Sequence, residues 1–375
     1  MQRLLLTVTF LLSLQLMGFG QDYKQITLNA GVQAADSASR AALATWDAYL
    51  GATATDKPSY WAADERTRYA GGDLLLHEGF VRPNIYAFIT HKVVLSFARQ
   101  ADDLYLCRTQ FYWETGTEPA RQLQVLAVVS VYLQRQHGHW VLRNYLPHAT
   151  QHWSMHQVGM LTYRVPPGYH FRRAGARQAA SFLAGIFRDF DIAPFPVTYY
   201  VVPDCDALQH LRGFEYVLGM GLGSPPVCGF YDEVNHLVYA GGQGEAYLHE
   251  LAHVINPYFP QAHPLLLTGF AGLKGGHYGH SLRYHKDRVR AYLATHSVDL
   301  TNPLEFTSLD AETNPQYVIG GIFCELALQQ GGLPKLKALL RYGTSDADFY
   351  RALEQELHLR RADLPAVIKQ QLLKP

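Results

Sequence analysis

Apolar and polar residues in the first part of the chain follow one helical pattern and then several strand patterns. Val32 to Leu50 is rich in alanine and has apolar residues at helical spacing, which predicts a helix. Turn-like stretches such as Ala101-Asp102-Asp103 then separate four segments rich in Val, Tyr, Phe and Leu, which predict strands. These segments are Ile85 to Phe97, Leu104 to Trp113, Leu123 to Leu133 and His139 to Tyr145. We therefore expect a helix followed by a strongly curved antiparallel sheet.

From Gly159 the pattern changes to short strands mixed with helices. Strands are predicted at Met160 to Val165, Pro196 to Val202 and His236 to Ala240, and a helix at Ala174 to Phe190. The remaining segments have helical spacing. They are Ala246 to Ile255, Leu265 to Leu273, Ser281 to His296, Tyr317 to Gln330, Pro334 to Tyr342, Ala347 to Leu357 and Ala362 to Leu373. The prediction is an α+β chain whose C-terminal half is mainly helical.

The length of 375 residues fits two domains, each with enough apolar residues for its own core. A polar stretch rich in His and Gln, Pro147 to Val158, is the expected boundary. It separates an N-terminal α+β domain, residues 21–150, from a second domain, residues 158–375. The order of one helix and a curved sheet in the first domain resembles the nuclear transport factor two-like or cystatin-like arrangement.

The first residues have the features of a signal peptide. Arg3 supplies a positive charge, Leu4 to Met17 is apolar, and the small residues Gly18 and Gly20 follow. We expect residues 1–20 to be removed and the mature protein to be secreted or periplasmic. No later segment is apolar enough to predict a membrane span.

Charge and cysteine content narrow the choice of function. Basic and acidic residues balance at 32 each, so the chain lacks the basic surplus typical of nucleic-acid binding. None of the four cysteines forms the Cys-x-x-Cys spacing of a zinc ribbon. In an oxidising compartment Cys205 and Cys228 are the expected disulfide, since both lie in one loop-rich region. Four buried free thiols, with Cys107 and Cys324 among them, are the alternative.

The strongest chemical signal is the sequence His249-Glu250-Leu251-Ala252-His253 in an apolar helical segment. Residues four apart lie one above the other on a helix, so His249 and His253 can bind one zinc ion. Glu250 is turned by about 100° from His249, where it can act as general base on a water molecule at that ion. This chemistry is typical of peptide hydrolysis.

With its surroundings, the motif resembles the gluzincin, or peptidase MA-like, family of zinc metallopeptidases. The motif is followed by Leu266-Leu267-Thr268-Gly269-Phe270-Ala271 and Gly275-Gly276, and the resemblance is strongest from Glu245 to Gly276. It implies a zincin-like domain with a mixed sheet, with His249 and His253 as zinc ligands and Glu250 as catalytic base. It also implies that His236 to Ala240 is an edge strand that pairs with an extended peptide substrate.

The sequence departs from this family at the third zinc ligand, which is a glutamate in a downstream helix. The matching position holds Thr268, whose hydroxyl is a poor zinc ligand. Three interpretations stay open: another side chain replaces the glutamate, the site is impaired and the protein only binds peptides or partners, or the match at Thr268 is misaligned. The candidate replacements are His263, His277, His280 and Glu325. The expected function is therefore that of an exported zinc-dependent hydrolase with a peptide or protein substrate, or that of a peptidase-fold binding protein.

Overall fold

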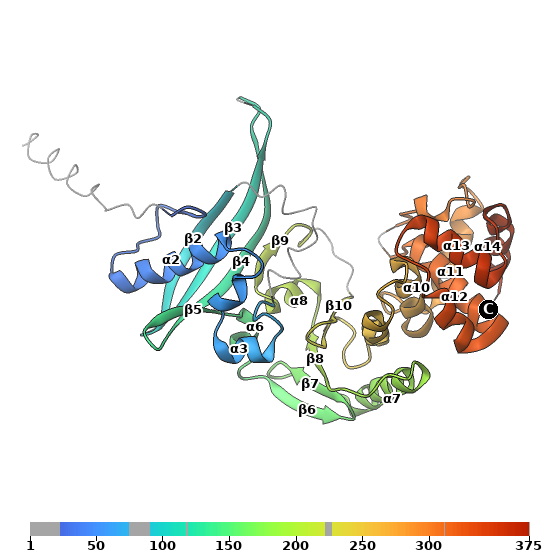
Figure 1. Cartoon of the computed structure of the whole chain (residues 1–375), viewed down its shortest axis with the longest axis horizontal. Coiled ribbons are helices and arrows are strands. Elements are labelled where there is room, and N and C mark those ends of the chain that lie inside the picture. Colours follow the sequence, from blue (N-terminus) through green and yellow to red (C-terminus); the bar gives the residue numbers. More distant parts are fainter. Residues whose placement is uncertain (1–22, 75–90, 118, 222–226, 311, 375) are drawn as a thin grey trace, which may run out of the picture. The chain divides into compact units, whose positions relative to one another are not determined.

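The computed structural model of the chain describes residues 23–74, 91–117, 119–221, 227–310 and 312–374. It is a mixed α+β structure, with two mixed sheets in the N-terminal part and a mostly helical C-terminal part. The chain divides into two compact units, Met1–Tyr145 and Leu146–Pro375 (Figure 1). The predicted signal peptide lies outside the described residues.

The first unit contains a long helix and a sheet whose strands follow the chain order. Strands β2 to β5 pair antiparallel, and β1 pairs parallel with β2. The predicted helix begins five residues later than expected, because the Asp36 side chain accepts a hydrogen bond from the backbone of Ser39 and caps it there. The elements are β1 Thr27–Leu28, α2 Ser37–Gly51, α3 Ala63–Arg68, β2 His91–Ala101, β3 Leu104–Thr115, β4 Gln122–Gln136 and β5 His139–Arg143, with a 3₁₀ turn η1 at Lys57–Tyr60.

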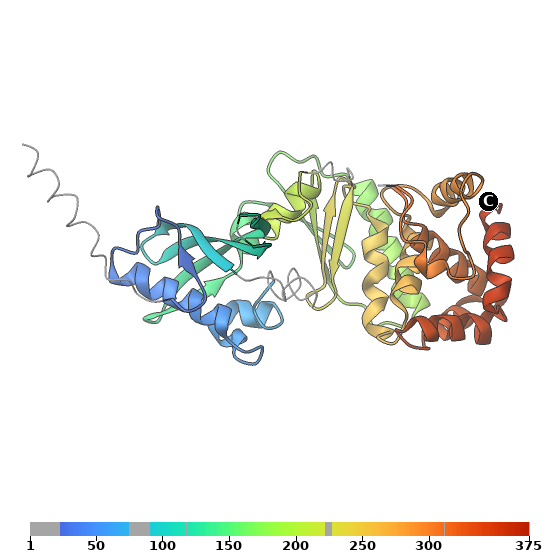
Figure 2. The ribbon, with the colours of Figure 1, turned by 90° about the horizontal axis from the view of Figure 1, so that it is seen from above.

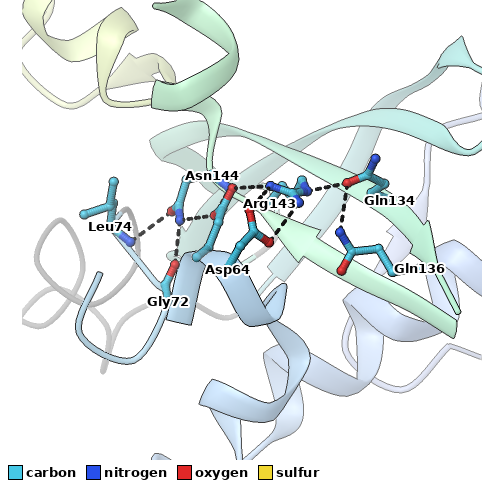
Figure 3. A network of polar contacts seen from close by, with 8 residues as sticks. Asp64, Gly72, Leu74, Gln134, Gln136, Arg143 and Asn144 are labelled. Atoms are coloured by element: carbon cyan, nitrogen blue, oxygen red, sulfur yellow. Dashed lines mark hydrogen bonds and ion pairs between the residues drawn. The ribbon is translucent and has the colours of Figure 1, made fainter. Parts of the chain in front are cut away.

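A polar network joins α3 to the end of β5 (Figure 3). Glu65, which is buried, accepts hydrogen bonds from the backbone and side-chain nitrogens of Asn144 at 2.8 and 2.5 Å. Arg143 pairs with Glu65 at 3.3 Å and with Asp64 at 2.9 Å. The Asn144 side chain also accepts from the backbone of Leu74 at 2.9 Å. The polar groups of this network are matched donor to acceptor, which indicates a structural role.

The second unit has a five-stranded sheet in the order β10-β11-β8-β7-β6. The three inner strands are parallel, and the edge strands β10 and β6 are antiparallel to their neighbours. One prediction was wrong here: the strand predicted at His236 to Ala240 corresponds to β11, which is an inner strand and not an edge strand. The polar stretch from Pro147 to Val158 contains β6. The bounds are β6 Ser154–Val158, β7 Leu161–Val165, β8 Val197–Val202, β9 Phe214–Val217, β10 Cys228–Asp232 and β11 Leu237–Gly241.

Alternate residues of the sheet in the second unit face opposite ways. Val197, Tyr199 and Val201 of β8 belong to one buried core with α7 and the C-terminal helices, which lie on the same side of the sheet in Figure 2. The helices are α6 Tyr145–Ala149, α7 Arg173–Asp189, α8 Cys205–Leu211, α9 Leu248–Ala252, α10 Pro264–Gly275, α11 Leu282–Leu293, α12 Pro315–Leu339, α13 Asp346–Leu357 and α14 Leu364–Leu372. Three 3₁₀ turns add η2 His253–Tyr258, η3 Pro303–Glu305 and η4 Arg361–Asp363.

The expected disulfide between Cys205 and Cys228 is confirmed, and it joins α8 to the edge strand β10. Cys107 and Cys324 are free and buried. Among the described helices, none is both long enough and apolar enough to span a membrane.

Candidate metal and catalytic site

Two buried tyrosines from the sheet hold the segment that leads into α9. Tyr199 donates its hydroxyl proton to the carbonyl of Gly244 and accepts from the backbone of Tyr247, both at 2.9 Å. Tyr163 donates to the carbonyl of Glu245 at 2.9 Å. The buried Glu245 carboxylate in turn accepts from the backbone of Arg172 at 2.6 Å. These bonds fix the direction in which α9 starts.

His249 and His253 lie on adjacent turns and face each other. The ring centroids are 5.0 Å apart, and His249 is buried. The α-helix predicted to reach Ile255 ends at Ala252 and continues as the 3₁₀ turn η2, so His253 begins the tighter turn. Burial lowers the pKa of His249 to about 4 and that of His253 to about 3, so both rings are neutral at pH 7. A neutral imidazole is the form that binds a metal ion.

The other nitrogen of His249 already has a partner. Its Nδ1 donates to the carbonyl of Gly276 at 2.6 Å, which fixes the tautomer and leaves Nε2 as the free lone pair. His253 is held differently, because the side-chain nitrogen of Asn256 lies 3.2 Å from its Nδ1 and 2.6 Å from a Glu233 carboxylate oxygen. The Asn256 oxygen is buried without a partner. The amide nitrogen is fixed in this orientation by the Glu233 carboxylate, so binding a metal ion through Nε2 of His253 would require the Asn256 side chain to move away from Nδ1.

Glu250 lies between the two histidines in sequence and packs against the edge strand β10. A Cβ atom on Gly229 would lie 2.6 Å from a Glu250 carboxylate oxygen, so the lack of a side chain at residue 229 makes room for this carboxylate. Glu250 makes no hydrogen bond with the described residues and is buried, which raises its pKa to about 8. A carboxyl group with a raised pKa beside a histidine pair is suited to accept and return a proton.

His277 is the candidate third ligand that lies beside this pair. Its ring centroid is 5.1 Å from that of His249, and both of its ring nitrogens are buried without a hydrogen-bond partner. It is 9% exposed, and it lines a small cavity with Tyr317 and His285. Burial and the neighbouring histidines lower its pKa to about 3. An unpaired buried imidazole is costly, which makes this residue unusual.

His285, which has no recognisable motif spacing in the sequence, holds the loop that carries His277. Its Nε2 donates to the carbonyl of His277 at 2.9 Å, and its Nδ1 accepts from the Thr313 hydroxyl at 2.9 Å. The loop is a tight turn in which Gly276 and Tyr278 have positive φ angles of 76° and 47°. The position of His285 in the sequence does not indicate this role, because its hydrogen bond to the His277 carbonyl depends on how the turn folds against α11.

The other predicted third ligands make contacts elsewhere. His263 caps α10 and lies 3.4 Å from an Asp346 oxygen. The His280 ring stacks on Tyr284, with centroids 4.0 Å apart. Glu325 forms an ion pair with the buried Lys286 at 2.5 Å. Of the four candidates, His277 is the one whose ring lies beside that of His249 among the described residues.

Thr268 lies on the side of α10 that runs along the site. Residues 268, 272 and 275 share one helix face by their spacing. Gly272 lines the cavity with His277, and a Cβ on Gly275 would lie 2.2 Å from the backbone nitrogen of His249. Thr268 thus shares a helix face with residues that lie beside His249 and His277.

The donor set suits zinc in type, since His249 and His277 present unpaired imidazole nitrogens in a buried setting. As the side chains stand, however, the described residues contain no group of three or more His, Cys, Asp or Glu side chains arranged so that it could hold a metal ion. A metal-binding arrangement therefore requires side-chain rotation. Neither a protein-family model nor a curated protein matches this chain.

Proposed function

We propose that the protein is a zinc-dependent peptidase that acts on an extended peptide. The observation that carries the proposal is the pair of neutral imidazoles of His249, which is buried, and His253, which is half-buried. The Glu250 carboxyl group lies beside them without a hydrogen bond among the described residues. The imidazole nitrogens thus have lone pairs available for a metal ion, and Glu250 is a group next to them that can accept and return a proton.

His249 and His253 would hold the metal ion through Nε2. A zinc ion, when bound, polarises a carbonyl oxygen and makes water acidic near neutral pH. The Gly276 carbonyl keeps His249 in the required tautomer through the bond to Nδ1. Glu250 takes the proton from the attacking water and delivers it to the leaving amine.

The edge strand β10 is the proposed place for the substrate. Among the described strands it pairs with β11 alone, so its other edge offers backbone donors and acceptors to an extended peptide. Gly229 of β10 touches Glu250, and a peptide that lengthens the sheet there would pass next to the catalytic base. The proposed substrate-binding edge is therefore β10 and not the strand at His236 to Ala240.

A second candidate function is peptide binding without hydrolysis. Thr268, on the α10 face that runs along the site, favours it, because a threonine hydroxyl holds zinc far more weakly than a carboxylate. The same open edge of β10 would then serve for binding alone.

The test is hydrolysis of a quenched fluorescent peptide library by residues 21–375. We expect chelator-sensitive cleavage that falls at least about 1,000-fold in Glu250→Gln, because the general base is lost. Glu354→Gln, the same change at an exposed position of α13, is the control and should cleave like the unmodified chain. Peptide binding with no cleavage would favour the second function, and cleavage unchanged by Glu250→Gln would overturn the first.

A further inference from the structure

We infer that His277 is the third metal ligand of this site and takes the place that the family gives to a glutamate. The inference rests on the proposed metal site and goes further by naming an all-histidine ligand set, His249, His253 and His277. Its starting point is an imidazole that is nine-tenths buried and whose two nitrogens have no partner.

The spacing of the rings fits ligands of one ion. With zinc–nitrogen bonds of about 2.0–2.1 Å and tetrahedral angles, the ring centroids of two ligating imidazoles lie about 5 Å apart. The observed separations are 5.0 Å for His249 and His253 and 5.1 Å for His249 and His277. His249 is thus at ligand spacing from both other rings.

Turning the His277 ring toward the ion breaks no hydrogen bond, because neither nitrogen makes one. A small cavity lies beside the ring and is lined by Gly272, Tyr317 and Val318 among others. By contrast, turning His285 would break bonds to Thr313 and to the His277 carbonyl. Of these two neighbouring buried histidines, His277 is the one whose ring can turn without losing a hydrogen bond.

The turn that contains Gly276 and His277 contributes to two of the proposed ligands. The Gly276 carbonyl orients His249, and the next residue supplies His277. His285 fixes the turn from α11 through the His277 carbonyl, which makes it a positioning residue. A loop held at both places sets the distance between the two rings, as a ligand pair requires.

A purely structural role accounts for His277 less well. Structural buried histidines bond through their nitrogens, as His285 does, whereas His277 leaves both unpaired next to two other neutral histidines. Three imidazoles without a carboxylate also predict a preference for Zn²⁺, Co²⁺ and Cu²⁺ over Mg²⁺ and Ca²⁺.

The first experiment measures zinc affinity by competition with a chromogenic chelator. We expect His277→Ala to weaken zinc binding at least about 100-fold, as His249→Ala does, since two ligands hold zinc poorly. His280→Ala, in the same turn, is the matched control and should bind like the unmodified chain, because its ring stacks on Tyr284 instead. Circular dichroism checks that each variant is folded.

The second experiment gives a positive signal even if His277→Ala folds badly. In His277→Cys loaded with Co²⁺ we expect a thiolate-to-cobalt charge-transfer band, which His280→Cys should lack. The inference is overturned if His277→Ala binds zinc normally and His277→Cys shows no charge-transfer band. The proposed function still stands in that case if His249→Ala loses the metal. If the unmodified chain binds no zinc at all, both fail.

Discussion

Two buried polar clusters in this chain differ in how completely their groups are paired. Around Glu65, Arg143 and Asn144, each carboxylate or amide meets a partner from α3, β5 or the backbone (Figure 3). Around α9, the His277 nitrogens have no partner and the Glu250 carboxylate makes no hydrogen bond among the described residues. The first cluster stabilises the fold as it stands, whereas the second retains unused lone pairs that suit a ligand.

The largest predicted effect on stability is in the fully paired cluster around Glu65. Glu65→Ala leaves the backbone nitrogen of Asn144 and part of Arg143 without an acceptor and removes one of the two acceptors of the Asn144 side-chain nitrogen. It should lower the free energy of unfolding of the first unit by about 3 kcal/mol. Urea denaturation measures this loss. Asp64→Ala, which removes a mostly exposed partner of the same arginine, should cost less than about 1 kcal/mol. Equal losses in the two variants would contradict the structural assignment.

The next effect concerns Glu250 in chelator-treated protein. Its folded pKa of about 8 lies above the ordinary 4.5, so this group's contribution to stability is complete below pH 4.5 and is lost as the pH rises through 8. Glu250→Gln removes the cost of a buried charge and should raise the free energy of unfolding at pH 9 by about 2 kcal/mol, with little change at pH 4. Thermal denaturation at both pH values measures it. An equal effect at both would mean that the carboxyl group is not titrating in this range.

The smallest predicted effect contrasts two neighbouring histidines in metal-free protein. His277→Leu removes two unpaired buried nitrogens and should raise the free energy of unfolding by about 1 kcal/mol. His285→Leu, the matched control, leaves Thr313 and the His277 carbonyl unpaired and should lower it. Denaturant titrations of both variants test the contrast. A marked loss in His277→Leu would show that its nitrogens have a stabilising partner.

Much of the fold followed from periodicity. Strands β3 and β4 of the first sheet and helices such as α7 and α13 were predicted to within a few residues, because each has one buried face. The strand predicted at Ile85 to Phe97 overlaps β2, and its residues 85–90 lie outside the described part of the chain. Other elements gave no clear pattern. Strand β6 is polar along much of its length, and β10 is five residues long with Gly229 inside it, so the edge strand was assigned to β11.

The site was predictable only where its residues are close in sequence. The spacing of His249 and His253 indicated a ligand pair at once, because helix geometry alone brings them together. The choice among His263, His277 and His280 could not be made from sequence. It depends on a turn with positive φ angles at Gly276 and Tyr278 and on a hydrogen bond from α11, which only the folded chain provides.

The disulfide between Cys205 and Cys228 affects how the open edge of β10 behaves. An unpaired strand edge can accept a neighbouring copy of the same chain as readily as a peptide, which is a common start of aggregation. Because the first residue of β10 is covalently tied to α8, the strand is hindered from peeling away or shifting its register against β11. The end strand of this sheet is thereby held in one place against β11.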